Sequence, residues 1–500
     1  MHRKKKSGRV VCSPGSLRHL TRGLSARVAR SAGGDDEAQP PSASSTSRTR
    51  ASRPGRVMTA ILVHGAGAGG PVVYMGAPMR ACTKATLADA VGRLRPGMTV
   101  LMPPGCAEPA ALVGELCRQA ERLRDLTLVG GIHLGDYPFA RPETAALRYA
   151  TWHMSPRLEE ARRRGRVVFV PLRYFDLTTA FAPGGAWAPD CVLVHCAPPD
   201  RHGYLSLGVG VGVALPAARR APLVIAQVNP RMPRTRGNAC LHRSQVDCWV
   251  EVDAALYEYP PPAITAVERA IGRAVAGLVP DGATVQVGVG AIPQAVLEAL
   301  GGHRDLALHS LLVDASVDLV ERGVVTCAAK PLHRGRMDVA EAMGTRRLFD
   351  FLHEHPAVNM EPSTWVHDPD VVARLPRFVA INSALEVDLT GQVTAESLGA
   401  RQVAGIGGQF DFVLGASRSP GGVSVVALPS TGRDGAVSRV VARLATGAAV
   451  TAPRYLVDRV VTEHGVAELR GRDERERAAA LIAVAHPRFR EELERSLRSS

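Results

Sequence analysis

Two kinds of hydrophobic pattern alternate along most of the chain. Residues 86–94 carry apolar side chains at helical spacing, and a Pro-Gly pair then leads into the apolar run 98–102, which predicts a helix followed by a buried strand. Similar short apolar runs predict strands at residues 126–130, 166–171, 191–195 and 223–227. Helices that alternate with fully apolar strands are typical of α/β architecture with parallel sheets.

The same alternation starts again after a proline-rich segment. Residues 257–263 contain three consecutive prolines, which disfavour helix and predict an extended linker. Thr265 and Glu268 then have the spacing of a capping box in front of an amphipathic helix. We therefore predict an α/β protein of two domains with mainly parallel sheets, at residues 76–258 and 263–495, and a cleft between them.

The net charge of +14 is concentrated in the first 57 residues. They hold thirteen Lys and Arg against three acids, a balance of +10, which leaves +4 for the other 443 residues. Residues 1–57 have few large apolar side chains and are predicted to be a disordered basic leader. A targeting segment, or a translation start at Met58, are the alternatives. The folded body is close to neutral, so no nucleic-acid partner is expected.

The nine cysteines are scattered, with no CxxC pair and no histidine spacing of a zinc site. This pattern indicates reduced thiols rather than disulfides or a metal site, so we predict a cytoplasmic protein without a metal. No apolar run reaches the roughly 18 residues that a transmembrane helix needs, and no membrane partner is expected.

Two glycine-rich loops are candidate binding elements. Residues 288–293 read Gly-Val-Gly-Ala-Ile-Pro between a predicted strand and helix, so their backbone amides can hold a phosphate or a developing oxyanion. The glycines of residues 405–412 allow a ligand, or another stretch of backbone, to approach closely. A tight turn is the alternative for either loop. The GxSxG elbow of serine hydrolases does not occur in the sequence.

A set of motifs in a fixed order gives a specific resemblance. They are PPDRHGY at 198–204, QVNPRMPRT at 227–235, GVGAIP at 288–293, INSALEVDLTGQ at 381–392, GIGGQFDF at 405–412, ALPST at 427–431, VTEHGVA at 461–467 and AHPRF at 485–489. Together they resemble the acetyl-CoA hydrolase/transferase family, especially its 4-hydroxybutyrate CoA-transferase-like branch, over about residues 86–495.

The resemblance implies a fold, a substrate and binding residues. The fold would be two α/β domains of the CoA-transferase type, assembled as a homodimer, with acyl-CoA bound in the cleft and a short-chain carboxylate as the second substrate. Coenzyme A would act as a substrate. Its binding residues would be Gly288, Val289, Gly290, Ala291 and Ile292 around the acyl thioester, and Gly405, Gly407, Gly408 and Gln409 around CoA.

The position of the nucleophile departs from the family pattern. The family uses a glutamate after His-Ser as an acyl carrier, whereas this chain reads His309-Ser310-Leu311. Leucine cannot carry an acyl group. Asp314, three residues further on, is the candidate replacement, with a helix N-cap as the alternative role. His202, His309, Glu396 and Glu463 are weaker candidates for which a structural role is favoured.

Two functions follow from these patterns. The first is an enzyme that moves or hydrolyses the CoA thioester of a short-chain carboxylic acid. The second is a catalytically impaired CoA-binding pseudoenzyme or partner subunit, and it depends on Leu311 alone.

Overall fold

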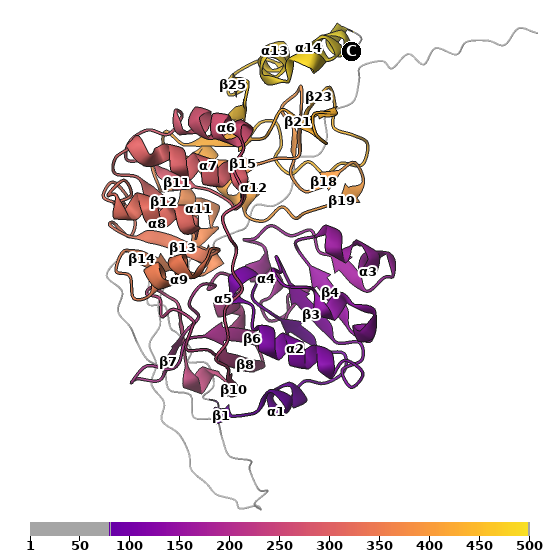
Figure 1. Cartoon of the computed structure of the whole chain (residues 1–500), viewed down its shortest axis with the longest axis vertical. Coiled ribbons are helices and arrows are strands. Elements are labelled where there is room, and N and C mark those ends of the chain that lie inside the picture. Colours follow the sequence, from indigo (N-terminus) through magenta and orange to yellow (C-terminus); the bar gives the residue numbers. More distant parts are fainter. Residues whose placement is uncertain (1–79, 81, 499–500) are drawn as a thin grey trace, which may run out of the picture. The chain divides into compact units, whose positions relative to one another are not determined.

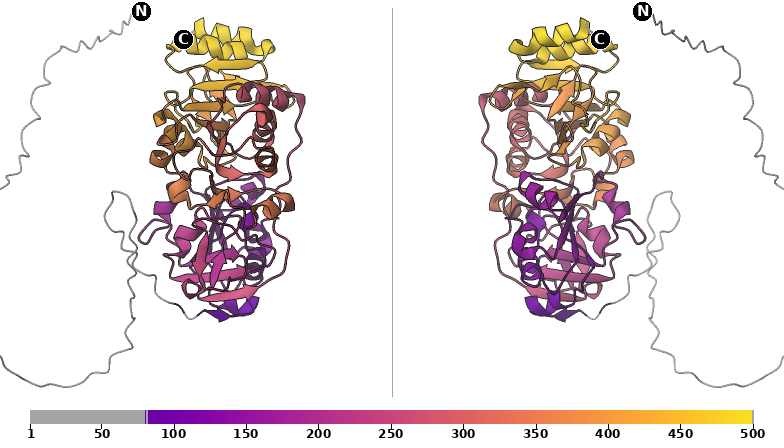
Figure 2. Two further views of the ribbon diagram at one scale, coloured as in Figure 1. Left: turned by 90° about the vertical axis from the view of Figure 1, so that its left-hand side faces the viewer. Right: turned by 90° about the vertical axis from the view of Figure 1, so that its right-hand side faces the viewer.

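The computed structural model describes residue 80 and residues 82–498. The predicted leader, residues 1–57, lies outside the described residues. The described chain contains two large sheets, each covered by helices, as Figures 1 and 2 show.

The first lobe is built on an eight-stranded sheet in which every neighbouring pair is parallel. In spatial order its strands are β1 (Thr83–Lys84), β10 (Cys248–Glu251), β8 (Leu223–Val228), β6 (Cys191–Cys196), β2 (Thr99–Leu101), β3 (Thr127–Gly130), β4 (Arg148–Thr151) and β5 (Val167–Phe169). Its helices are α1 (Leu87–Gly92), α2 (Ala110–Arg118), α3 (Glu159–Arg163), α4 (Leu177–Ala180) and α5 (Ala214–Ala218). A separate antiparallel pair joins β7 (Tyr204–Ser206) to β9 (Cys240–His242).

The second lobe repeats this plan, with one antiparallel pair at the edge of its eight-stranded sheet. In spatial order its strands are β14 (Val358–Met360), β13 (Met337–Ala342), β12 (Ala307–Leu312), β11 (Thr284–Gln286), β15 (Phe378–Ser383), β20 (Val423–Ala427), β24 (Arg459–Thr462) and β25 (Gly465–Glu468). Its helices are α6 (Ala266–Ala276), α7 (Ala291–Ala299), α8 (Asp314–Glu321), α9 (Arg346–Leu352), α10 (Ser363–Val366), α11 (Pro369–Ala373), α12 (Gln409–Arg418), α13 (Glu474–Val484) and α14 (Pro487–Arg498).

Three small sheets complete the second lobe. One places β16 (Glu386–Asp388) between β17 (Val393–Thr394) and β23 (Val440–Val441); the others pair β18 (Ser397–Leu398) with β19 (Arg401–Gln402), and β21 (Thr431–Gly432) with β22 (Val437–Ser438).

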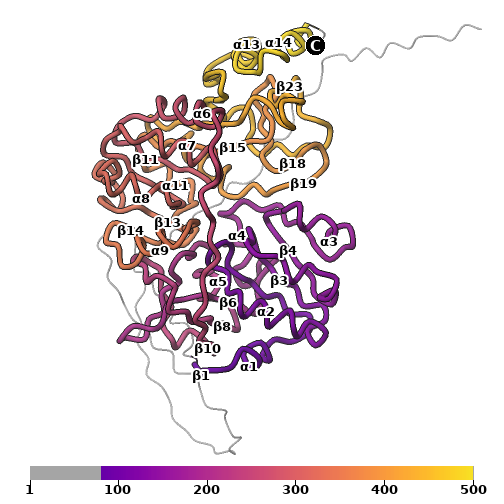
Figure 3. Tube along the Cα trace, viewed as in Figure 1, coloured from indigo at the N-terminus to yellow at the C-terminus, as the bar shows by residue number. Residues whose placement is uncertain are grey.

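The α/β class with mainly parallel sheets is confirmed, and so are the individual elements that carried it. Each apolar run that the sequence analysis assigned to a strand contains one, namely β2, β3, β5, β6 and β8. The capping box before α6 is present, because Thr265 accepts from the Val267 amide while Glu268 accepts from the Thr265 amide. The linker between β10 and α6 has no helix or strand, and Figure 3 follows it between the lobes.

The two lobes share backbone hydrogen bonds and one hydrophobic core. The Val211 and Gly212 amides of the first lobe donate to the Ala340 carbonyl of β13, at 3.0 and 3.1 Å, and the Ala342 amide donates to Val209 at 2.8 Å. The main hydrophobic cluster runs without a break from β6 and β8 to β11, β12 and β13. These contacts hold β13 at the junction of the lobes.

Candidate active site

A cavity of about 370 Å³ lies between the two lobes. Its walls come from the carboxyl ends of β2, β3 and β4 in the first lobe, and of β11, β12, β13 and β15 in the second. Parallel α/β sheets bind ligands at this edge, because the loops that leave the strands converge there. The cleft predicted from the sequence is therefore present.

Most of the predicted CoA-binding residues line this cavity. They are Gly288, Val289, Gly405, Gly407, Gly408 and Gln409. Gly290 lines a smaller adjoining cavity, at the N-terminus of α7, with φ of 120°. Ala291 and Ile292 form the first turn of that helix and line neither cavity. The role of all nine in binding CoA stays a prediction.

Two buried polar atoms of the cavity wall have no hydrogen-bond partner among the described residues. They are Nδ1 of His367 and Nε2 of Gln409. Burial lowers the pKa of His367 to about 3, so its ring is neutral at physiological pH. Buried polar atoms without partners are costly, and their position in a cavity wall suits a polar ligand.

Gly405 brings the two lobes into contact at the cavity wall. A Cβ at this position would overlap the carbonyl oxygen of Trp152, which belongs to the other lobe. The glycine cluster thus allows the close approach of backbone that the sequence analysis gave as one of its uses.

Gly405→Ala is expected to destabilise the protein by roughly 2–3 kcal/mol, because neither backbone segment can move without disturbing the contact between lobes. It should also raise the KM for acyl-CoA, since Trp152 lines the cavity. Urea denaturation and steady-state kinetics measure both effects. The control is Gly302→Ala, at an exposed site where nothing lies within 4 Å of the added Cβ. Equal stability of the two variants would contradict the close-approach role.

The end of β12 has an irregular backbone. Ser310 has φ of 90°, in the region that residues other than glycine seldom adopt. The register of β12 with β13 shifts at this point: Ser310 pairs with Val339, but Leu311 pairs with Glu341. Ala340 is therefore an extra residue on β13, as in a β-bulge, a feature found next to active sites.

Glu341 contributes a partly buried carboxylate to the cavity wall. Oε1 accepts a hydrogen bond of 2.8 Å from the Tyr174 hydroxyl, and both side chains line the cavity. The carboxylate lies against Gly210 and Gly212, where a Cβ would overlap it. Burial raises the pKa of Glu341 to about 8, against the lowering effect of the Tyr174 hydrogen bond.

The sequence analysis missed Glu341 and its partner Tyr174. The signal that could have revealed the glutamate is the presence of two acids, Asp338 and Glu341, in segment 337–343, whose other residues are apolar. An acid without a cationic partner in a cavity wall is a candidate for function when its pKa is strongly shifted, as that of Glu341 is.

Asp314, the sequence candidate for the nucleophile, lies at the start of α8. Its carboxylate accepts from the Thr345 amide at 2.9 Å and from the Thr345 hydroxyl at 2.7 Å. It lines the small adjoining cavity together with Gly290, and not the large one.

The weaker candidates have structural partners. His309 is buried, its Nε2 lies 2.7 Å from the Val366 carbonyl, and burial lowers its pKa to about 4. Glu396 accepts from Thr451 at 3.0 Å, and Glu463 from the Ser430 amide at 2.8 Å. His202 is exposed and does not line the cavity.

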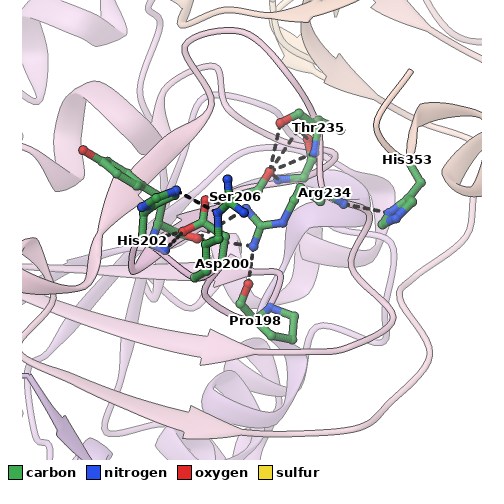
Figure 4. Close-up of polar contacts among 10 residues, drawn as sticks. Pro198, Asp200, His202, Ser206, Arg234, Thr235 and His353 are labelled. Atoms are coloured by element: carbon green, nitrogen blue, oxygen red, sulfur yellow. Dashed lines mark hydrogen bonds and ion pairs between the residues drawn. The ribbon is translucent and has the colours of Figure 1, made fainter. Parts of the chain in front are cut away.

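Two of the sequence motifs meet in a hydrogen-bonded loop region away from the cavity (Figure 4). Arg234 donates to the carbonyls of Pro198 and Tyr204 and lies 3.9 Å from the Asp200 carboxylate. The Thr235 amide donates to Ser206 at 3.0 Å. These contacts explain the motifs at 198–204 and 227–235 as supports of the β7–β9 pair.

Comparison with known proteins agrees with this fold. Residues 83–256 match the acetyl-CoA hydrolase/transferase N-terminal domain, and residues 344–497 match the C-terminal domain. The 4-hydroxybutyrate coenzyme A transferase of Clostridium kluyveri is 39% identical over 410 residues, which are 82% of this chain and 95% of that protein. The butyryl-CoA:acetate CoA-transferase of Anaerostipes caccae is 35% identical over 397 residues, 77% of this chain and 89% of that protein.

A solved structure shows the same arrangement. RipA from Yersinia pestis superimposes with a TM-score of 0.79 at 35% identity, over 83% of this chain and 97% of that one. The 4-hydroxybutyrate CoA-transferase from Porphyromonas gingivalis shares the fold as well, with a TM-score of 0.71 at 34% identity, over 83% of this chain and 97% of that one. This chain belongs to the acetyl-CoA hydrolase/transferase family.

The sequence analysis expected neither a metal site nor a membrane-spanning helix, and the described part of the chain can be searched for both. Within residues 82–498, no three His, Cys, Asp or Glu side chains are grouped so that they could hold a metal ion. No helix in that range is long and apolar enough to cross a membrane. The prediction of a metal-free protein stays a prediction.

Proposed function

We propose that this protein is an enzyme that moves the CoA of a short-chain acyl-CoA to a second carboxylate, or to water. The observation that carries the proposal is the cavity between the lobes, which the predicted CoA loops and the carboxylate of Glu341 line together. Membership of the acetyl-CoA hydrolase/transferase family and the activities named for its relatives support the same reaction class.

The cavity wall supports a short acyl chain. Its apolar side chains include Val289, Leu311, Met343 and Ile406, which suit the carbons of an acyl group. The unpaired atoms of His367 and Gln409 supply polar contacts for a thioester or a carboxylate. The particular acid is left open by this lining.

In the experiment, the full chain is incubated with acetyl-CoA, butyryl-CoA or 4-hydroxybutyryl-CoA, with and without acetate. Chromatography measures new acyl-CoA, and a thiol reagent measures free CoA. New acyl-CoA that requires acetate identifies a transferase, and thiol release in its absence identifies a hydrolase. Binding of CoA without either product would contradict the proposal and favour the pseudoenzyme that Leu311 suggests.

The proposal also covers the oligomeric state of the enzyme and its location in the cell. A homodimer is expected from the family resemblance. A cytoplasmic location is supported by the cysteines of residues 82–498, which are all free thiols, as is usual in a reducing compartment. Size-exclusion chromatography with light scattering measures the oligomeric state.

A further inference from the structure

Leu311 and Glu341 occupy neighbouring positions on adjacent strands of the second sheet, β12 and β13 (Figure 1). They are partners in the parallel register, so their side chains extend on the same face. Both line the large cavity. Neighbouring strands are about 4.8 Å apart, a separation that a glutamate side chain can span. A carboxylate on β13 can therefore act on a thioester bound beside β12.

The β-bulge gives Glu341 this orientation. Side chains alternate between the two faces of a strand, so a shift of one residue moves a side chain to the opposite face. In uninterrupted register from Ser310 and Val339, Leu311 would pair with Ala340 and Glu341 would point away from the cavity. The extra residue on β13 brings the carboxylate to the same face as Leu311.

Glu341 is the one carboxylic acid among the described residues that line the large cavity. Asp314 is held by Thr345 and lines the smaller cavity. Cys106 also lines the cavity, but burial raises the pKa of its thiol to about 12, which leaves it protonated and unreactive near neutral pH.

We propose that Glu341 takes the place of the glutamate missing at position 311 and carries the acyl and CoA groups during transfer. This inference rests on the proposed function and makes it more specific, since it assigns transfer to a second carboxylate rather than hydrolysis as the main reaction. It departs from the sequence prediction of Asp314.

The reaction balances through two exchanges on one carboxylate. A Glu341 oxygen attacks the thioester carbonyl, the carbon–sulfur bond breaks, and a mixed anhydride and CoA thiolate form. The thiolate attacks the glutamyl carbonyl and releases the donor acid, which leaves a glutamyl-CoA thioester. The acceptor carboxylate then attacks this thioester, and the thiolate takes the acceptor acyl group from the second anhydride. Free Glu341 is restored without oxidant, reductant or net proton transfer.

Tyr174 is a positioning residue in this scheme. Its hydroxyl donates to Oε1 of Glu341, and its ring lies 4.4 Å from the ring of His367. The structure gives Oε2 no hydrogen-bond donor among the described residues, so the Tyr174 hydroxyl orients the carboxylate through Oε1 only. No described Lys or Arg forms an ion pair with the carboxylate, which keeps it nucleophilic once it is ionised.

The direct test traps the intermediate on the unmodified protein. The full chain is mixed with acyl-CoA, treated with borohydride, which reduces a glutamyl-CoA thioester to the alcohol, and digested for peptide mass spectrometry. The expected result is the reduced side chain at position 341. Reduction at Asp314, or an acyl group on Cys106, would overturn the inference. Because no variant is used, the result does not depend on the folding of a mutant.

The second test is Glu341→Gln, which keeps the shape of the side chain and removes the nucleophile. Transfer is expected to fall at least about a thousandfold, while the Kd for CoA changes less than threefold. The control is Glu361→Gln, a partly buried acid that does not line the cavity and accepts a hydrogen bond from Asn359. It should transfer CoA at the wild-type rate.

The outcomes separate this inference from the proposed function. If the wild-type enzyme transfers CoA and the Glu341→Gln variant does so at a similar rate, the role of Glu341 is overturned, and the proposed function of the protein still holds. Loss of activity in the variant, combined with thiol release into water and no trapped adduct in the wild type, makes Glu341 a general base and also overturns the inference. A wild-type chain that neither transfers nor hydrolyses contradicts both.

Discussion

The rate of CoA transfer is expected to rise about tenfold per pH unit below pH 8 and to level off above it. Burial raises the pKa of Glu341 to about 8, and only the carboxylate form can attack the thioester. Protonation at lower pH therefore removes the nucleophile in proportion. Single-turnover transfer, measured between pH 5.5 and 9, gives the profile. A rate that is flat or falls with pH would contradict an essential role for the ionised group.

The other titratable groups that line the large cavity do not change charge in this range. Burial raises the pKa of the Tyr174 hydroxyl far above its usual value, and that of Cys106 to about 12. Burial lowers the pKa of His153 to about 4 and that of His367 to about 3, so both rings are neutral above pH 5.5. Asp411, which accepts from the Phe175 amide at 3.1 Å, does titrate in this range, since burial raises its pKa to about 7. The variants below therefore assign the rise to Glu341.

Two variants control the assignment of the pH profile. Tyr174→Phe should move the rise to higher pH, because the Tyr174 hydrogen bond lowers the pKa of Glu341 against the effect of burial.

Glu341→Gln is used to test the same pKa by a stability measurement that needs no substrate. Because the folded pKa is raised, wild-type stability is greatest below the unfolded pKa of about 4.5 and is lost as the pH rises towards 8. The variant should lack this loss.

Lys330→Met is expected to destabilise the protein by roughly 3–5 kcal/mol, because it leaves a buried carboxylate without its cation. Lys330 is 2% exposed and donates to Asp338 at 2.6 Å and to the Arg336 carbonyl at 3.0 Å. Burial would raise the pKa of Asp338, but Lys330 and other partners hold it below its usual value. Urea denaturation at pH 7 measures the loss.

The matched control removes both charges. Lys330→Met combined with Asp338→Leu replaces the buried pair by apolar groups, which costs much less than breaking it. A single variant as stable as the wild type, or a double variant less stable than the single one, would contradict this account. Asp338 is the second residue of β13, three residues before Glu341, so the single variant should also lower activity.

The sequence was sufficient for the fold because the decisive signals are local. Apolar runs of strand length, the linker prolines and the capping box of Thr265 each depend on residues close together in the chain. The loops at Gly288 and Gly405 could also be found, since glycine allows backbone conformations and close contacts that other residues do not. Both loops do line the cavity.

The catalytic carboxylate could not be found in the same way. Glu341 reaches the cavity because β13 lies beside β12 and because the register shifts after Ser310. Neither the strand order nor the shift has a local sequence signal. Asp314 was chosen because it is near Leu311 along the chain, but the structure directs its carboxylate to Thr345. Glu341 is close to Leu311 across the sheet although it is thirty residues away along the chain.

The register shift between β12 and β13 changes how relatives of this protein should be compared. A single alignment column at position 311 would mark the chain as inactive, since it holds leucine. The column at 341, thirty residues later, belongs to the neighbouring position across the sheet, on the same cavity wall. Loss of an acid in one column and gain in the other can thus conserve a reaction while both columns look variable. Enzymes with such an exchange would be misclassified as pseudoenzymes unless the two strands are examined as a pair.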